Sequence, residues 1–360
     1  MAAERPPSSG GEPVRGQPDT DPAADPPGGD PQVGPEPGEF AAAARILSAA
    51  PDVTLFAHVN PDADALGSAL ALGRVLQRQG AVVRVAFGAP AEPAEALRAL
   101  DTDGLLVPVH QVPATPSALV VCDTGSLERL GPLADRVAAT AGAGGPVVVL
   151  DHHVGNPRYG TVNIIDERAE ATALLALRLV DELGGELDRQ VARCLYAGLA
   201  TDTRSFRAAG VQAYRVAARL LSTGIDPDAI LRPLLDDHPF TWLGVLSEVL
   251  ADAHLEPDAA AGLGLVHAAV PWSAMCRVRG EDVDSVIDLL RTTSEAEVAA
   301  VLKETAPGIW SVSLRADSRV DVGRAATACG GGGHRLASGF TSRAEPAVIL
   351  RELRAALAEG

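Results

Sequence analysis

Three side chains that can bind a metal ion lie close together in one short segment, at His58, Asp62 and Asp64. An apolar run, residues 53–57, precedes them, and a stretch with helical periodicity follows, so the segment predicts a strand, a tight turn and a helix start. Like charges this close repel one another unless a cation lies between them. A helix-capping cluster, with Asp64 or Ser68 as the cap, would explain the same residue types.

Other apolar runs end in residues of the same kind. One run is followed by Asp123, and another by Asp151, His152 and His153. Short apolar runs separated by helical patterns predict a buried parallel sheet. The carboxyl ends of parallel strands meet at one edge, where ligands bind. Asp alone is common in turns, but several such endings and a double histidine predict a metal site at that edge.

Asp202 follows an apolar helical stretch and adds a further candidate ligand. Its neighbours Thr201 and Thr203 would suit hydrogen bonds that orient a metal ligand. A plain helix-end residue is the alternative interpretation of Asp202.

A second candidate site lies near the C-terminus, where four glycines precede a histidine. Glycines in a row disfavour regular structure, at about 1 kcal/mol each relative to alanine in a helix. They suit a backbone that approaches a phosphate or a base closely, and the histidine and an upstream arginine can donate to an anion. A flexible linker and a surface arginine are the alternatives. The predicted substrate-binding residues are Arg315, Gly330, Gly331, Gly332, Gly333 and His334.

Composition limits the partners. The formal net charge of -17 excludes broad attraction to a long nucleic acid, so a nucleic-acid substrate must be short or gripped locally. The four cysteines are scattered, as expected for free thiols in a reducing cytoplasm. We expect a cytoplasmic protein, because no signal peptide pattern and no run of about 18 apolar residues is present.

The order of patterns along the chain predicts two α/β domains. Residues 1–38 are rich in Pro, Gly, Asp and Ala and predict a disordered tail. Residues 39–238 predict a parallel sheet with helices on both faces. Residues 239–258 predict a connecting helix, and residues 259–360 a smaller α/β domain with a mixed sheet. We expect a cleft between the two domains.

These motifs resemble those of the DHH phosphoesterases. The triplet that begins at Asp151 resembles the family signature, and the segment from His58 to Ser68 resembles its first motif. Ser313-Leu-Arg, together with the glycine run, resembles the DHH-associated C-terminal domain. The resemblance covers about residues 40–360, and the subgroup it resembles is that of the NrnA-type nanoRNases, which are oligoribonucleases that also act as pAp phosphatases.

The resemblance implies two divalent metal ions, usually Mn²⁺, with Mg²⁺ and Co²⁺ left open. It places His58 and Asp62 on one metal, and Asp64, His152 and Asp202 on the other, with Asp123 bridging the two. Imidazole and carboxylate ligands together suit Mn²⁺. Two metals can clamp the oxygens of a transferring phosphoryl group.

The resemblance also implies roles in catalysis for Asp123, Asp151 and His153. His153 would contact the scissile phosphate or assist the leaving group, and Asp151 would orient its neighbours. Two positions depart from the family pattern. Ala63 and Arg204 stand where relatives often have glycine.

The implied activity is hydrolysis of short oligoribonucleotides to mononucleotides and dephosphorylation of 3'-phosphoadenosine 5'-phosphate (pAp). Hydrolysis of cyclic di-AMP or of its linear product pApA is the alternative within the family. A catalytically silent nucleotide sensor is the alternative of another class, and loss of a ligand would be its mark. No membrane partner is expected, and a homodimer is left open.

Overall fold

The computed structural model describes residues 34–35, 38–333 and 335–358. The predicted disordered tail therefore lies almost wholly outside the described residues, and so does His334.

The first sheet has five parallel strands in the order β2-β1-β3-β4-β5, which confirms the predicted parallel sheet. Its strands are buried runs rich in Val, Leu and Ile, as expected where helices cover both faces. The sequence analysis did not predict the last strand. The strands are β1 (Asp52–Ala57), β2 (Val82–Phe87), β3 (Leu119–Cys122), β4 (Val147–Asp151) and β5 (Val162–Ile165).

The strand order reverses at β1. The chain passes from β1 outward to β2, returns to the other side of β1 for β3, and continues outward to β5. Such a reversal opens a crevice beyond the carboxyl ends of the two strands that flank it. The crevice is therefore expected beyond β1 and β3.

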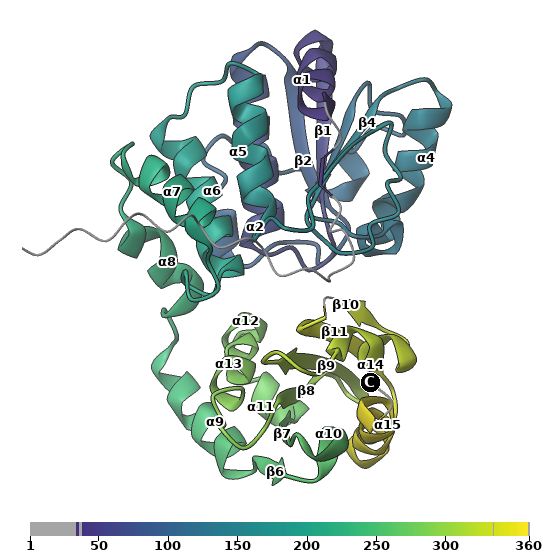
Figure 1. Ribbon diagram of the computed structural model, residues 1–360, viewed down its shortest axis with the longest axis vertical. Coiled ribbons are helices and arrows are strands. Elements are labelled where there is room, and N and C mark those ends of the chain that lie inside the picture. The colour runs from purple at the N-terminus through teal and green to yellow at the C-terminus, as the bar shows by residue number, and fades with distance from the viewer. Residues whose placement is uncertain (1–33, 36–37, 334, 359–360) are drawn as a thin grey trace, which may run out of the picture. The chain divides into compact units, whose positions relative to one another are not determined.

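Helices cover both faces of this sheet (Figure 1). One face carries the larger core and the other a smaller one, formed under α4 (Ala134–Gly142) and the 3₁₀ segment Leu127–Leu133. The helices that build the larger core are α1 (Glu39–Ala49), α2 (Ala63–Arg78), α5 (Thr172–Glu182), α6 (Arg189–Asp202), α7 (Val211–Leu221) and α8 (Pro227–Leu235), with the short α3 (Glu95–Arg98) at its edge.

Helices α2 and α6 pack closely because glycine lies at their crossing. A Cβ atom at Gly67 would lie 2.4 Å from the carbonyl oxygen of Cys194. Any side chain there would separate the two helices. This matters for function because α2 begins, and α6 ends, with candidate ligands.

The second sheet has six strands in the order β10-β11-β9-β8-β7-β6 and is mixed. Only β7 and β8 are parallel, and β8 and β9 form the predicted antiparallel pair. The strands are β6 (His254–Glu256), β7 (Leu265–Val270), β8 (Val298–Ala306), β9 (Ile309–Ala316), β10 (Gly332–Gly333) and β11 (Ala337–Ser342).

Each face of the second sheet has its own core. One core includes residues of α10 (Ala259–Gly262), α14 (Val322–Ala328) and α15 (Pro346–Ala358). The other includes residues of four helices, which are α9 (Phe240–Ala251), α11 (Trp272–Met275), α12 (Gly280–Asp284) and α13 (Val286–Leu290). The smaller α/β part with a mixed sheet is thereby confirmed.

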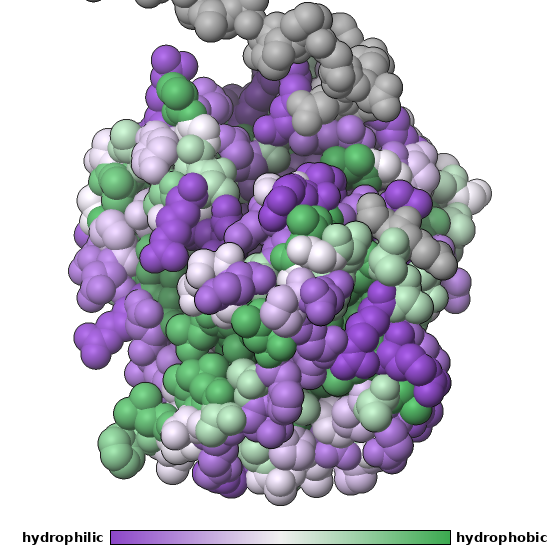
Figure 2. All heavy atoms as spheres, turned by 60° about the horizontal axis from the view of Figure 1, so that its bottom comes forward, coloured by the Kyte–Doolittle hydropathy of each residue, from purple (hydrophilic) through white to green (hydrophobic). Residues whose placement is uncertain are grey.

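The segment predicted as a connecting helix is divided in the structure. Helix α9 buries Trp242 and Val245 against the second sheet, and the chain then forms the edge strand β6. On its outer side α9 leaves Phe240 and Leu243 exposed, at 88% and 57%. Hydrophobic residues gather on the lower left of the face shown in Figure 2, the side on which α9 lies in Figure 1. No helix among the described residues is long and apolar enough to cross a bilayer.

Candidate metal centre

The structure brings the predicted ligands together at the carboxyl edge of the first sheet. His58 follows β1, Asp123 follows β3, and His152 follows β4. Helix α2 begins directly after the first loop, and α6 ends at Asp202. The candidate residues therefore converge where the strand order places the crevice.

The first group joins His58, Asp62 and Asp123. Nε2 of His58 lies 3.5 Å from Oδ2 of Asp62 and 3.6 Å from Oδ2 of Asp123. Asp62 also caps α2, because its Oδ1 accepts hydrogen bonds from the main-chain N–H groups of Asp64 and Ala65. The cap is thus Asp62, and not Asp64 or Ser68. One carboxylate oxygen holds the helix while the other faces the histidine.

The second group joins Asp64, His152 and Asp202, whose nearest ligand atoms all lie within 4.8 Å of one another. Nε2 of His152 lies 3.3 Å from Oδ2 of Asp202 and 3.4 Å from Oδ1 of Asp123. Asp123 therefore turns one oxygen to each histidine. This is the arrangement expected of a carboxylate shared by two metal positions.

Both imidazoles are oriented by the main chain. Nδ1 of His58 lies 2.9 Å from the carbonyl oxygen of Val59, and Nδ1 of His152 lies 2.9 Å from that of Ala169. A carbonyl oxygen only accepts, so each Nδ1 must carry a proton. Nε2 is then the ligand atom on both rings.

The electrostatics of this cluster suit a bound cation. Burial opposes a charge on His58, but the carboxylates of Asp62 and Asp123 raise the pKa of His58 to about 10. Burial raises the pKa of Asp64 well above its ordinary value, and repulsion from Asp123 and Asp202 adds to this. Asp202 lies at the C-terminal end of a helix, where the dipole disfavours an acid. Divalent cations would offset the burial and mutual repulsion of these carboxylates and the unfavourable helix dipole at Asp202. The donor set therefore fits two metal ions.

Asp151 and His153 form a separate pair. Oδ1 of the fully buried Asp151 lies 2.6 Å from Nδ1 of His153, and its Oδ2 accepts a hydrogen bond of 2.5 Å from the amide of Asn156. Both oxygens of Asp151 are thus engaged by side chains, so Asp151 is placed to orient His153. Asn156 was not among the predicted site residues, although a polar residue soon after a double histidine is a signal for such a contact.

The start of α5 was also missed by the sequence analysis. The main-chain N–H groups of Thr172 and Ala173 donate to the two carboxylate oxygens of Asp64, at 2.6 and 2.9 Å. The hydroxyl of Thr172 donates to Oδ1 of Asp123 at 2.9 Å. Thr201 and Thr203, which were expected to support Asp202, instead donate to carbonyl oxygens of α6.

The chain turns sharply after Asp202. Arg204, Ser205 and Phe206 all have left-handed backbone conformations, with φ between 54° and 66°. Such conformations cost roughly 1–2 kcal/mol per residue for side chains other than glycine. Glycine adopts a left-handed conformation without that cost, which suits the glycine that the resemblance implies at the position of Arg204. Nothing in the structure explains the arginine.

Gly198 makes room for Asp64. A Cβ atom there would lie 2.7 Å from Oδ1 and 2.8 Å from Cα of Asp64. We expect Gly198→Ala to displace Asp64 and to weaken Mn²⁺ binding at least about tenfold, with a loss of stability of about 1–3 kcal/mol. Calorimetric titration with Mn²⁺ and thermal unfolding would measure the two effects.

The control is Gly142→Ala in α4, where an added Cβ meets nothing within 4 Å. It should leave Mn²⁺ binding unchanged and cost no stability. Wild-type Mn²⁺ affinity in Gly198→Ala would contradict the assignment of Asp64 to the site.

Three of the predicted substrate-binding residues, Arg315, Gly332 and Gly333, lie on strands of one part of the second sheet. Arg315 on β9 pairs with Ala337 on β11, and Gly332 on β10 pairs with Gly339 on β11. Arg315 is half-buried. The sequence motifs around it and around the glycines thus come together in three adjacent strands.

Backbone geometry accounts for three of the four glycines. Gly330 and Gly331 end α14 with hydrogen bonds to the carbonyl oxygens of Thr327 and Ala326, and Gly330 is left-handed with φ of 82°. A Cβ atom at Gly331 would lie 2.1 Å from the carbonyl oxygen of Gly339. These glycines are required by the fold itself.

Gly333 is likewise fixed, with φ of 140° and too little room for a Cβ atom beside Ser338. Gly332 differs, because its φ is not in the left-handed region and a Cβ atom there would meet nothing within 4 Å. Only Gly332 among the four has no structural reason in the described residues to be glycine.

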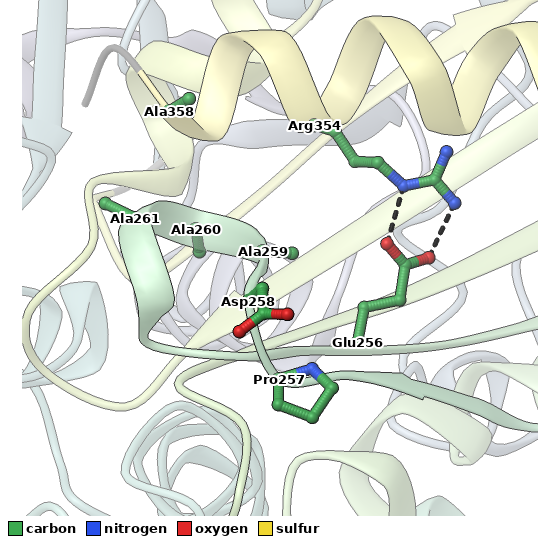
Figure 3. Close-up of a pocket in the computed structure, with 8 residues that line it drawn as sticks. All are labelled: Glu256, Pro257, Asp258, Ala259, Ala260, Ala261, Arg354 and Ala358. Carbon is green, nitrogen blue, oxygen red and sulfur yellow. Dashed lines mark hydrogen bonds and ion pairs between the residues drawn. The ribbon is translucent and has the colours of Figure 1, made fainter.

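A pocket on the second sheet is separate from these sites. It lies between α10, β6 and α15, and its charged residues are Glu256, Asp258 and Arg354 (Figure 3). Arg354 binds Glu256 through two hydrogen bonds of 2.6 Å. Because its arginine is already neutralised, the pocket offers no unpaired cation to a phosphate.

Comparison with known proteins agrees with this fold. The model of the DHH family, N-terminal domain, matches residues 52–199, and that of the DHHA1 domain matches residues 272–359. The chain belongs to the DHH phosphoesterase family and carries the family's DHHA1 domain. The DHH domain contains the five-stranded parallel sheet, and the DHHA1 domain contains strands of the six-stranded mixed sheet.

Two sequence relatives and one solved structure show how similar this chain is to individual members of known families. The bifunctional oligoribonuclease and PAP phosphatase NrnA of Thermus thermophilus is 33% identical over 287 residues, 79% of this chain and 82% of the relative. A probable protein of the same name from Streptococcus mutans is 25% identical over 306 residues, covering 84% and 94%. A crystal structure of an exopolyphosphatase-related protein from Bacteroides fragilis shares the fold, with a TM-score of 0.79 and 21% identity over 90% of this chain and 97% of that one.

Proposed function

We propose that this phosphoesterase hydrolyses short oligoribonucleotides to mononucleotides and removes a phosphate from pAp, with two Mn²⁺ ions bound at the carboxyl edge of the first sheet. The observation that carries the proposal is the shared carboxylate, Asp123, between two groups of His and Asp ligands. The similarity to a relative named as an oligoribonuclease and PAP phosphatase supports the choice of substrate.

The contacts support the roles proposed for the ligands. His58 and Asp62 would hold one metal, Asp64, His152 and Asp202 would hold the other, and Asp123 would be shared by the two. Metal ions held by these residues would activate a water molecule and neutralise charge on the phosphoryl oxygens. Carboxylate and imidazole donors together suit Mn²⁺, with Mg²⁺ or Co²⁺ as substitutes.

His153 is proposed to contact the scissile phosphate and to give a proton to the leaving oxygen. Its Nδ1 is engaged by Asp151 at 2.6 Å, so Nε2 is the nitrogen proposed for this role. Asp151, fixed in turn by Asn156, sets the orientation of the ring.

Arg315, the glycine run and His334 are proposed to hold the terminal nucleotide. A planar guanidinium binds a phosphate through two parallel hydrogen bonds. Gripping one end of the substrate is compatible with a net charge of -17, which disfavours tracking along a long strand.

The proposal is tested by Mn²⁺-dependent turnover of three substrates, which are pAp, an RNA of two to five nucleotides, and cyclic di-AMP. Mononucleotides from the RNA and phosphate from pAp are the expected products. Preference for cyclic di-AMP or pApA would reassign the substrate to a second messenger and keep the site. Tight nucleotide binding without turnover of any of them would overturn the hydrolase and identify a sensor.

Gly332→Ala tests the substrate role of the glycine run. We expect the variant to fold normally, because a Cβ atom meets nothing there, and to raise the KM for pAp about tenfold, since a methyl group would occupy the path of the nucleotide. Steady-state kinetics would measure this. Gly280→Ala, which is equally open, is the control and should keep the wild-type KM. An unchanged KM in Gly332→Ala would remove this residue from the substrate site.

A further inference from the structure

Helix α5 begins directly beneath both groups of candidate ligands. Thr172, its first residue, is fully buried and touches two of the carboxylates. The hydroxyl donates to Asp123 at 2.9 Å, and the main-chain N–H donates to Asp64 at 2.6 Å. One residue is thus bound to the shared carboxylate and to a carboxylate of the second group.

The hydroxyl selects one oxygen of Asp123. It binds Oδ1, the oxygen that lies 3.4 Å from Nε2 of His152. The other oxygen, Oδ2, lies 3.6 Å from Nε2 of His58. A hydrogen bond to Oδ1 fixes the rotation of the carboxylate about its Cβ–Cγ bond. That rotation decides whether Asp123 offers one oxygen to each metal position or both to the same one.

We propose that Thr172 is a positioning residue, whose hydroxyl holds Asp123 in the bridging orientation and so couples the two metal positions. The inference rests on the proposed two-metal centre and adds a residue that is not itself a ligand. A carboxylate without this support is free to rotate towards a single cation. Hydrogen bonds of this kind to metal ligands typically change metal affinity about 10–100-fold.

The test compares Thr172→Val with Thr172→Ser in the full chain, using Mn²⁺ alone as the probe. Valine keeps the shape of threonine and removes the hydroxyl, whereas serine keeps the hydroxyl. Calorimetric titration should show that Thr172→Val binds the second Mn²⁺ about 10–100-fold more weakly, with the first bound nearly as in the wild type. Thr172→Ser should stay within about threefold of the wild type for both ions.

Electron paramagnetic resonance gives an independent readout. A bridged pair of Mn²⁺ ions is magnetically coupled, and we expect the coupled signal in the wild type and in Thr172→Ser but not in Thr172→Val at equal metal loading. A purely structural role for Thr172 would lower the unfolding temperature and leave the coupling of the folded protein unchanged.

Thr140→Val is the matched control. Thr140 is also fully buried, in α4, which packs on the first sheet. Its hydroxyl has no hydrogen-bond partner within the part of the chain that the structure describes. Its replacement should change neither Mn²⁺ affinity nor coupling. If Thr172→Val does not fold, Thr172→Ala removes the hydroxyl without adding a methyl group in its place and carries the same expectation.

The outcomes separate this inference from the proposed function. A wild-type protein that binds no Mn²⁺ pair would overturn the two-metal centre, and this inference with it. A wild type that binds a coupled pair, with Thr172→Val binding the same pair at the same affinities, would overturn the role of Thr172 alone.

Discussion

Asp123→Asn should lower kcat at least about 1,000-fold and abolish the binding of one of two Mn²⁺ ions. Both carboxylate oxygens of Asp123 face candidate ligand groups, through His58 on one side and His152 on the other. An amide offers one oxygen and one nitrogen that carries two hydrogens, so it cannot bridge two cations. Calorimetric titration with Mn²⁺ and single-turnover kinetics on pAp would measure the two effects.

Asp101→Asn is a suitable control for Asp123→Asn. Its carboxylate accepts hydrogen bonds, in this case from the main-chain N–H groups of Leu105 and Leu106, but it belongs to none of the candidate metal groups found among the described residues. This change should lower stability by about 1–3 kcal/mol and leave the Mn²⁺ stoichiometry intact. Retention of two Mn²⁺ ions by Asp123→Asn would refute the bridging assignment.

His153→Ala is expected to separate metal binding from catalysis. We expect kcat to fall by about 100- to 10,000-fold, as for loss of a general acid, while both Mn²⁺ ions remain bound. The reason is that Nδ1 of His153 is engaged by Asp151, and the ring is proposed to act on the substrate rather than to hold a metal. Rapid-quench kinetics at saturating Mn²⁺ would give kcat, and calorimetry the stoichiometry.

Asp151→Asn should show the same pattern with a smaller loss. Because Asp151 is proposed to act through His153, the double variant should be no slower than His153→Ala alone.

A different result for His153→Ala would change the role assigned to His153. Asp123, His152 and His153 also lie close enough together to hold an ion, and loss of one Mn²⁺ ion in His153→Ala would make His153 a ligand.

The convergence of the candidate ligands was predictable because three of them directly follow apolar strands. In a parallel sheet, strand ends collect at one edge, so His58, Asp123 and His152 could be placed together without coordinates. Asp202 was harder to place, since the end of a helix, unlike the end of a strand in a parallel sheet, can lie against many different parts of the fold. Its position depends on the close crossing of α2 and α6, which glycines permit.

The supporting residues were not predictable in the same way. Thr172 and Asp64 are 108 positions apart, and their contact depends on how α5 begins over the first loop. No local pattern signals such a contact. The glycine run shows the converse difficulty, since three of its four glycines have a backbone reason to be glycine whether or not the run binds a ligand. The short edge strands β5 and β6 were missed because three or four residues carry little periodicity.

Metal binding by the candidate ligands would also depend on how far the chain has folded. His58, Asp123, His152 and Asp202 come from four segments that are distant in sequence, and the last of them ends α6. A chain in which α6 has not docked on α2 therefore has an incomplete site and little affinity for a divalent ion. Metal at 100 times its dissociation constant would favour the native state by about 2.7 kcal/mol. The supply of metal would then set the amount of folded protein, through a late step of folding, as well as the rate of catalysis.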